Sequence, residues 1–260
     1  MRKTVIAGAL ALLTWPAAAA AHSPYLLPNA FDLTKRDHVT VTASFTEVFF
    51  EPDIVMKSDS YAVIGPDGAR TAVTPAYLSD LAVFETKTTQ PGTYRITTGP
   101  RVGRVAKAYF ANGEWTFLEE PNSPVPAGAT AVDMQSLTTA DVYVSRGSPT
   151  DKALAPSGKG LEFKPITHPD AVFIGQDATF QVLFDGKPVA KLPVEVNAGD
   201  GRYGDKKKPA DLVTDADGRF TLKPAKPGLY HVMSRYRVPP PAAGGLAKSF
   251  TYALTFEATE

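Results

Sequence analysis

Short stretches in which apolar and polar side chains alternate recur along this chain. In residues 39–45, Val39, Val41, Ala43 and Phe45 are separated by polar residues. A period of two residues is typical of a half-buried β-strand. Further strands are predicted at residues 61–64, 70–73, 81–86, 141–144, 178–184, 231–238 and 249–256. No stretch of the first half shows the apolar period of an amphipathic helix, so the chain is predicted to be all-β.

Turn signals between these stretches indicate β-sandwiches. Residues 65–68 read Gly-Pro-Asp-Gly and predict a hairpin between two short strands. The pattern Pro-Gly-x-Tyr occurs at residues 91–94 and again at 227–230. In sandwich domains such a tyrosine packs its ring and forms hydrogen bonds through its hydroxyl. One copy in each half predicts two related sandwiches of immunoglobulin or transthyretin-like type.

The clearest candidate boundary is the segment 145–159, which contains Gly, Pro and Ser residues. We therefore expect an N-terminal β-sandwich domain at residues 22–144 and a linker at 145–159. A C-terminal transthyretin-like β-sandwich domain is expected at residues 160–260.

Residues 1–21 have the features of a secretory signal peptide. Arg2 and Lys3 form a basic start, residues 5–13 are apolar, and residues 17–21 are all alanine. The apolar run is shorter than the about 20 residues that span a bilayer. We expect a periplasmic protein that does not span the membrane after the signal peptide is cleaved.

Composition limits the chemistry of a site. The chain has 27 basic and 27 acidic residues, and its short basic run at residues 206–208 lies in a loop-like segment. No nucleic-acid partner is therefore expected. Because cysteine is absent, a metal site would use His, Met, carboxylates or the N-terminal amine. No Ser-His-Asp or His-Glu-x-x-His pattern is present, and we expect no enzyme.

His22 directly follows the alanines and is the leading candidate metal ligand. Cleavage after Ala21 would place the free α-amine and the imidazole on one residue. Cleavage after Ala20 or Ala19 would make His22 the second or third residue, and the third position suits square-planar Cu(II) or Ni(II). The alternative is a histidine without function at a frayed terminus.

Three further residues are candidate metal ligands. His231 and Met233 share one face of the predicted strand at residues 231–238, and such a pair can bind copper or nickel. The alternative is one exposed and one partly packed side chain. His168 lies in a turn before Pro169, where the alternative is a local hydrogen bond that stabilises the turn. A copper oxidase that uses His22 would need a second histidine presented by the fold.

Several stretches resemble a known exported family. They are the alanines followed by His22, residues 142–150, residues 158–162 followed by 167–169, and residues 184–188 together with 214–220. On these residues the chain resembles the NikM-like proteins, a domain of unknown function described as a periplasmic component of nickel or cobalt transport. The second half also resembles the carboxypeptidase-regulatory or transthyretin-like sandwich. The resemblance implies metal-ion handling outside the cytoplasm.

We therefore expect a soluble periplasmic metal-binding accessory protein for nickel, cobalt or copper uptake. Its ligand would be a divalent ion of one of these metals, and its partner an envelope transporter component. The alternative is a non-metal β-sandwich module of the cell envelope that binds or scaffolds a protein or a glycan.

Overall fold

The structure is a computed structural model that describes residues 22–118, 120–199, 211–242 and 244–260. The predicted signal peptide and the basic run at residues 206–208 lie outside these ranges. The described residues form three β-sheets and two short 3-10 helices, η1 (Lys152–Leu154) and η2 (Pro169–Ala171), without an α-helix. The predicted all-β class is therefore confirmed. No helix in the described ranges is long and apolar enough to cross a membrane.

A ten-stranded central sheet contains strands from both halves of the chain. Its two long middle strands, β11 and β19, are parallel and pair from Met134 with Ala247 to Val142 with Thr255. The sheet consists of β4 (Ala62–Ile64), β5 (Arg70–Ala72), β8 (Gly92–Thr97), β9 (Arg101–Ala111), β10 (Glu114–Phe117), β11 (Ala131–Arg146), β15 (Pro193–Ala198), β16 (Leu212–Val213), β18 (Gly228–Val238) and β19 (Ala247–Ala258).

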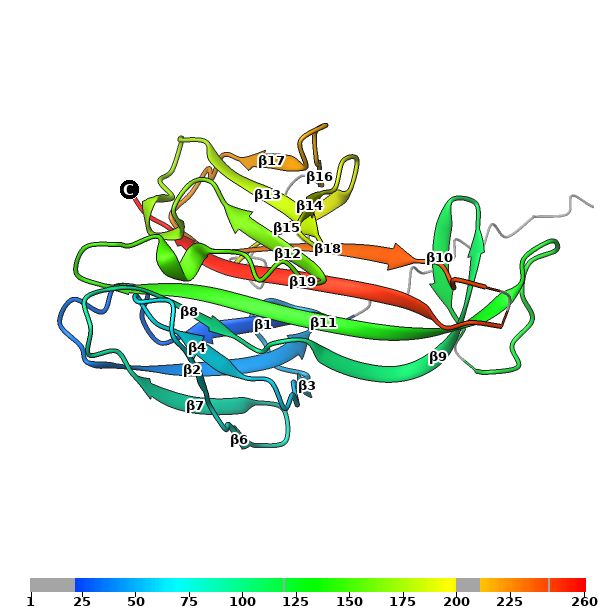
Figure 1. The fold of residues 1–260 in the computed structure, drawn as a ribbon, viewed down its shortest axis with the longest axis horizontal. Helices are drawn as coiled ribbons and strands as arrows, with labels where there is room; N and C mark the ends of the chain where they lie inside the picture. Colours follow the sequence, from blue (N-terminus) through cyan, green and yellow to red (C-terminus); the bar gives the residue numbers. More distant parts are fainter. Residues whose placement is uncertain (1–21, 119, 200–210, 243) are drawn as a thin grey trace, which may run out of the picture.

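Two smaller sheets cover opposite faces of the central sheet, so that the molecule has three layers (Figure 1). The N-terminal sheet contains β1 (Ser23–Pro28), β2 (His38–Thr46), β3 (Ile54–Val55), β6 (Ala76–Tyr77) and β7 (Ala82–Lys87). The other sheet, which we call the upper sheet, contains β12 (Leu161–Pro165), β13 (Ala178–Phe184), β14 (Lys187–Pro188) and β17 (Arg219–Leu222).

Each outer sheet encloses a hydrophobic core against the central sheet. On β11, Val142 packs in the first core, under the N-terminal sheet, while Tyr143 packs in the second core, under the upper sheet. On β18, Met233 belongs to the first core and Val232 to the second. Successive side chains of a strand point to opposite faces, so neighbouring apolar residues of one central strand serve both cores.

The Pro-Gly-x-Tyr pattern has the same role in both halves. The Tyr94 hydroxyl donates to the carbonyl of Gln90 (2.8 Å), and the Tyr230 hydroxyl donates to the carbonyl of Lys226 (2.9 Å). Each tyrosine ring is buried in a core, Tyr94 in the first and Tyr230 in the second. The predicted sandwich packing and the predicted use of these tyrosines are therefore confirmed.

The predicted linker, residues 145–159, connects β11 to β12 and thus the strands of the first core to those of the second. The central sheet nevertheless continues across this boundary, because β11 pairs with β19. The division into two domains stays a prediction.

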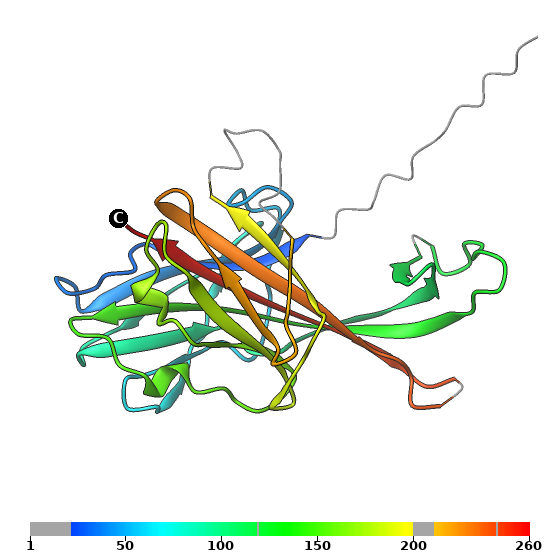
Figure 2. The same cartoon turned by 90° about the horizontal axis from the view of Figure 1, so that it is seen from above.

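One end of the central sheet extends beyond both outer sheets. We call this extension the arm and define it as β9, β10 and residues 131–138 of β11. Figures 1 and 2 show the arm leaving the layered part of the molecule on one side. A small cluster formed by Ala108, Met134 and Ala247, with Trp115 against it, packs within this part of the sheet.

Candidate functional site

A cavity of about 700 Å³ lies on the face of the central sheet that carries the second core. The upper sheet has four strands and the central sheet ten, so part of this face is left without a strand above it. Here β8, β11 and β19 present Arg95, Thr139 and Tyr252 to the cavity. The segment from η1 to the start of β12 forms the opposite wall, through residues such as Lys159 and Glu162.

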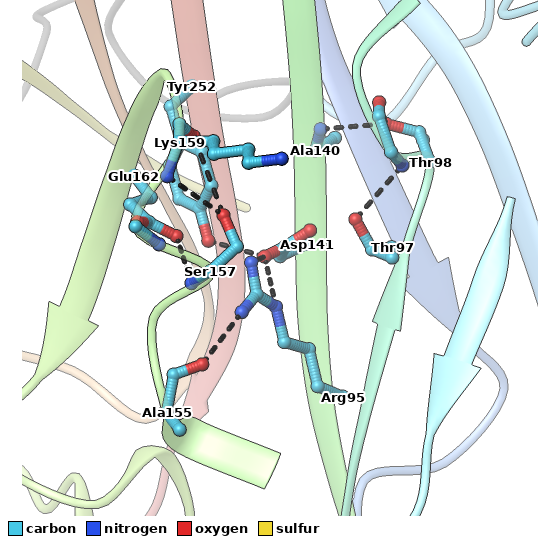
Figure 3. Close-up of polar contacts among 12 residues, drawn as sticks. Arg95, Thr97, Thr98, Ala140, Asp141, Ala155, Ser157, Lys159, Glu162 and Tyr252 are labelled. Carbon is cyan, nitrogen blue, oxygen red and sulfur yellow. Dashed lines mark hydrogen bonds and ion pairs between the residues drawn. The ribbon is translucent and has the colours of Figure 1, made fainter. Parts of the chain in front are cut away.

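Arg95 lies at the base of this cavity and forms a buried ion pair with Asp141 beneath it (Figure 3). Atom Nε of Arg95 donates to Oδ2 of Asp141 (2.6 Å), and NH2 of Arg95 lies 2.6 Å from the same oxygen. The Tyr252 hydroxyl also donates to Oδ2 of Asp141 (2.5 Å). Arg95 NH1 donates to the carbonyl of Ala155 in the opposite wall (3.3 Å). The guanidinium is therefore held in one orientation by contacts on both sides of the cavity.

Register explains why these three side chains meet. Arg95 pairs with Tyr143, so it lies on the same face of the sheet as the odd-numbered residues of β11, including Asp141. Tyr252 pairs with Thr139, which lies on that face too. Asp141 is fully buried, and a buried carboxylate is stable only when it is paired and hydrogen-bonded.

Electrostatics stabilise the charged form of Arg95. Burial opposes the charge on Arg95, but Asp141 beside it holds the pKa of the guanidinium well above its ordinary value. Burial, followed by the negative charge of Asp141, raises the pKa of Tyr252, so its hydroxyl remains a proton donor. Arg95 has five N–H groups, and its contacts with Asp141 and Ala155 engage three of them.

Glu162 shapes the wall opposite the sheet. Its side chain is buried and accepts hydrogen bonds from the backbone N–H groups of Ser157 (2.8 Å) and Gly158 (2.7 Å). These contacts fix the turn at residues 157–160 beside the cavity, and the exposed Lys159 of this turn belongs to the cavity lining. The carboxylate of Glu162 is directed at its own loop.

The cavity combines positive charge with apolar surface. Arg70, Arg95, Lys152 and Lys159 line it, and among the described residues Glu162 is the one carboxylate in the lining. The apolar part of the lining comes from Ile64, Leu137, Leu161 and Phe250. Ligand pockets of proteins usually have a volume of roughly 300–1,000 Å³ and a few convergent polar groups. This arrangement suits a small molecule with a negatively charged group and an apolar or ring-shaped body.

His22, the leading sequence candidate, lies directly before β1 and outside this cavity. Its Nε2 is 3.6 Å from Oε1 of Glu47, and the two side chains are 36% and 52% exposed. The pairing of Ser23 with Thr46 brings them together, since His22 and Glu47 are the next residues along. A metal ion bound by His22 would have the carboxylate of Glu47 beside it.

His231 and Met233 are both fully buried. Nε2 of His231 donates to the carbonyl of Pro24 (2.9 Å), so Nδ1 carries the lone pair and finds no hydrogen-bond partner in the described parts of the chain. The ring of Phe49 lies against the imidazole, with 4.2 Å between ring centroids. Met233 packs in the first core. His231 thus connects β18 to β1, whereas Met233 is a core residue.

His168 caps the short helix η2. Its Nδ1 accepts from the backbone N–H of Asp170 (3.1 Å), and its Nε2 faces the hydroxyl of Thr93 (3.1 Å). The contact with Asp170 is the local hydrogen bond that was the alternative to a metal-binding role for His168. Within the described ranges, no group of three or more His, Cys, Asp or Glu side chains that could hold a metal ion is found. Metal binding by His22, His168, His231 and Met233 stays a prediction.

Arg95, Asp141, Tyr252 and Glu162 were not singled out from the sequence. Asp141 begins the predicted strand at residues 141–144, and Arg95 directly follows the Pro-Gly-x-Tyr pattern at residues 91–94. A charged residue in a strand that is buried on both faces indicates that its side chain is paired with an opposite charge. The identity of the partner depends on strand order, which the pattern of a single strand does not contain.

Together the fold and the site define an all-β sandwich protein with a cavity of ligand size and positive character. The chain belongs to the family described as a domain of unknown function, DUF4198, which matches residues 19–238. That description contains no metal or transport role, so the NikM-like assignment stays a prediction. No curated protein matches the chain.

Several solved structures resemble the chain weakly. The D0-D1 domain of intimin is 14% identical, with 90% of this chain and 97% of that chain covered and a TM-score of 0.22. The Yersinia pseudotuberculosis adhesin InvE is 12% identical, with 90% and 58% covered and a TM-score of 0.20. The Escherichia coli adhesin FdeC is 16% identical, with 89% and 63% covered and a TM-score of 0.22. Similarities this low support no inference about the function of this chain.

Proposed function

We propose that this protein is a β-sandwich binding module of the cell envelope whose cavity holds a small organic anion. The observation that carries the proposal is the position of Arg95 at the base of a cavity with three further cations in its lining. Contacts to Asp141 and Ala155 fix the guanidinium before any ligand arrives. A preorganised binding group costs less conformational entropy when the ligand binds.

Two exposed lysines in the cavity wall would also take part in binding the anion. Lys152 and Lys159 are exposed, and both belong to the wall opposite Arg95. They would attract an anion by long-range electrostatics, while Leu137 and Phe250 would contact its apolar part. The expected role is binding without catalysis, and the expected location, outside the cytoplasm, rests on residues 1–21.

A panel of probes tests this proposal. Benzoate, phenyl phosphate, glucuronate and glucose 6-phosphate would be titrated against the chain beginning at His22, and binding would be followed by calorimetry. At least one anion is expected to bind with a dissociation constant below about 1 mM, and neutral benzyl alcohol and glucose are expected to bind more weakly. Failure of every anion to bind would overturn the proposal.

Charge reversal localises the binding. Lys159→Glu should weaken binding of the anion by about tenfold or more, because it places a like charge at the rim. Lys164→Glu is the matched control, since Lys164 is exposed on β12 and absent from the cavity lining. If both variants weaken binding equally, the anion binds elsewhere.

A metal-binding accessory role is a second candidate. The observation that favours it is the position of His22 beside Glu47 at the start of β1. Copper(II) and nickel(II) chloride would be titrated against the protein whose first residue is His22. Tight binding that His22→Ala abolishes and Glu47→Gln weakens would support this role, and binding that survives His22→Ala would contradict it.

A further inference from the structure

The outer edge of β9 has an unpaired stretch at residues 101–106. One edge of β9 pairs with β11, and β10 covers the other edge only at residues 108–111. Just beyond the open stretch, the Ser58 hydroxyl donates to the carbonyl of Thr98 (2.8 Å), and the N–H of Leu118 donates to the carbonyl of Lys107 (2.8 Å). No other described strand pairs with β9. Figure 1 shows β9 along the lower border of the arm without a strand beyond it.

Such an edge can accept another strand. In an antiparallel pair, alternate residues direct their N–H and C=O groups away from the partner. Residues 101–106 therefore present backbone groups on a side where no described strand pairs with them. Within this stretch the carbonyl of Gly103 accepts from the side-chain amide of Gln135 (3.3 Å). Unpaired edges of this kind are templates for the addition of an extended peptide.

A bulge gives this edge an apolar face. Val105 pairs with Gln135 and Val102 pairs with Leu137, so three steps along β9 correspond to two along β11. Gln135 and Leu137 lie on one face of β11, and both valines therefore lie on that face as well. Val102 is 61% exposed and Val105 47% exposed. A partner strand would find two neighbouring apolar side chains here.

The opposite face of β9 carries positive charge. Arg101 pairs with Thr138, which lies on the other face of β11, and its guanidinium lies 5.1 Å from the centre of the Phe45 ring. Nε of Arg101 is buried and has no hydrogen-bond partner among the described residues. Arg104 is exposed within the bulge. The exposed guanidinium of Arg104 would be complemented by an acidic side chain from a strand added at this edge.

We propose that an extended segment of a partner protein adds to the outer edge of β9 at residues 101–106. Its apolar side chains cover Val102 and Val105, and its acidic side chains face Arg101 and Arg104. A second copy of this chain is a poorer occupant, because residues 101–106 contain no Asp or Glu to complement Arg101 and Arg104. Two-fold antiparallel pairing centred on Arg104 would also place Arg104 opposite its own copy, and like charges opposite each other are destabilising.

A synthetic peptide tests this interface. The probe is a fluorescent peptide of alternating valine and glutamate with Gly-Ser ends, and its binding to the chain beginning at His22 is followed by anisotropy. The same peptide with alternate backbone amides methylated cannot form the strand hydrogen bonds and is expected not to bind. A valine–lysine peptide is expected to bind at least about tenfold more weakly, because charge complementarity selects the partner.

Charge-reversal variants make the test specific. Arg104→Glu should weaken the valine–glutamate peptide and strengthen the valine–lysine peptide, a reversal that loss of folding cannot produce. Arg219→Glu, at an exposed position of β17 on another sheet, is the control and should change neither. Absence of binding, equal binding of the methylated peptide, or equal effects of the two variants would overturn the proposal. Self-association of the chain that Arg104→Glu abolishes would also overturn it, in favour of a second copy.

Lys159→Glu at the cavity rim separates this inference from the proposed function. It should leave binding of the valine–glutamate peptide unchanged while it weakens binding of the small anion. A peptide that loses affinity in Lys159→Glu but not in Arg104→Glu binds in the cavity, which would overturn the edge proposal alone.

Discussion

Arg95 and Asp141 lie on neighbouring strands, β8 and β11, and form an ion pair with 2.6 Å between NH2 and Oδ2. Tyr252 on β19 donates to the same oxygen. One carboxylate oxygen thus connects three adjacent strands of the central sheet, two that precede β12 in the chain and one that follows it. The cavity above them depends on this connection, because it sets the direction of the guanidinium.

Replacement of Asp141 by Ala should be strongly destabilising. The variant leaves the buried guanidinium of Arg95 without its counter-charge, and breaking a buried ion pair costs about 3–5 kcal/mol. Asp133→Ala is the control, because Asp133 pairs with Lys107 at 2.9 Å on the surface, where a pair contributes about 0–1 kcal/mol. Urea unfolding of both variants measures the difference, and a loss below that of Asp133→Ala would contradict the central role of Asp141.

Glu162→Gln should loosen the turn at residues 157–160. An amide retains one acceptor oxygen, so the N–H groups of Ser157 and Gly158 lose one of two charged hydrogen bonds, each worth about 1.5–3 kcal/mol. We expect faster hydrogen exchange at these two amides and weaker anion binding in the cavity. Glu257→Gln, at the far end of β19, is the control. Unchanged exchange at Ser157 and Gly158 would show that the turn is held by other contacts.

His231 should make the stability of the protein sensitive to acid. Burial, partly offset by the hydrogen bond to Pro24 and reinforced by Arg235, lowers the pKa of His231 from 6.5 to about 4. The unfolded chain therefore takes up a proton at higher pH than the folded protein. The free energy of unfolding should fall by about 3 kcal/mol as the pH decreases from about 6.5 to about 4, and this contribution should not change further below that pH.

The His231→Gln variant isolates the contribution of His231 protonation to the free energy of unfolding. His231→Gln keeps an N–H donor for the Pro24 carbonyl but cannot be protonated, so the difference in stability between the native protein and this variant should shrink steadily across this pH range. His38→Gln, at a partly exposed position, is the control. Urea unfolding at several pH values gives the curves. Parallel curves for the native protein and His231→Gln would contradict the prediction.

Substitutions of Met233 distinguish a packing role from a metal-binding role. Because it is fully buried in the first core, Met233→Ala should lower the free energy of unfolding by about 2–5 kcal/mol. Met233→Leu preserves volume and removes the thioether, and it should cost less than about 1.5 kcal/mol. Copper(II) titration of the leucine variant provides the second measurement. Loss of metal binding in a variant that remains stable would assign Met233 to a metal site instead.

Local pattern was sufficient for much of the fold. Alternation in residues 39–45 predicted β2, and the Gly-Pro-Asp-Gly turn predicted the hairpin of β4 and β5. The Pro-Gly-x-Tyr pattern predicted the buried rings and bonded hydroxyls of Tyr94 and Tyr230. These features depend on contacts between residues that are close in sequence, and so a single stretch contains the information.

By itself, then, the sequence determined the all-β class, the sandwich packing and most strand positions, because strand period and turn chemistry are local properties. Only the tertiary structure decided that β11 and β19 join the two halves in one sheet and that Arg95, Asp141 and Tyr252 meet. It also placed His231 at the carbonyl of Pro24, 207 positions away. Such contacts follow from the order and register of strands distant in sequence, and the alternation within any one strand is compatible with many neighbours.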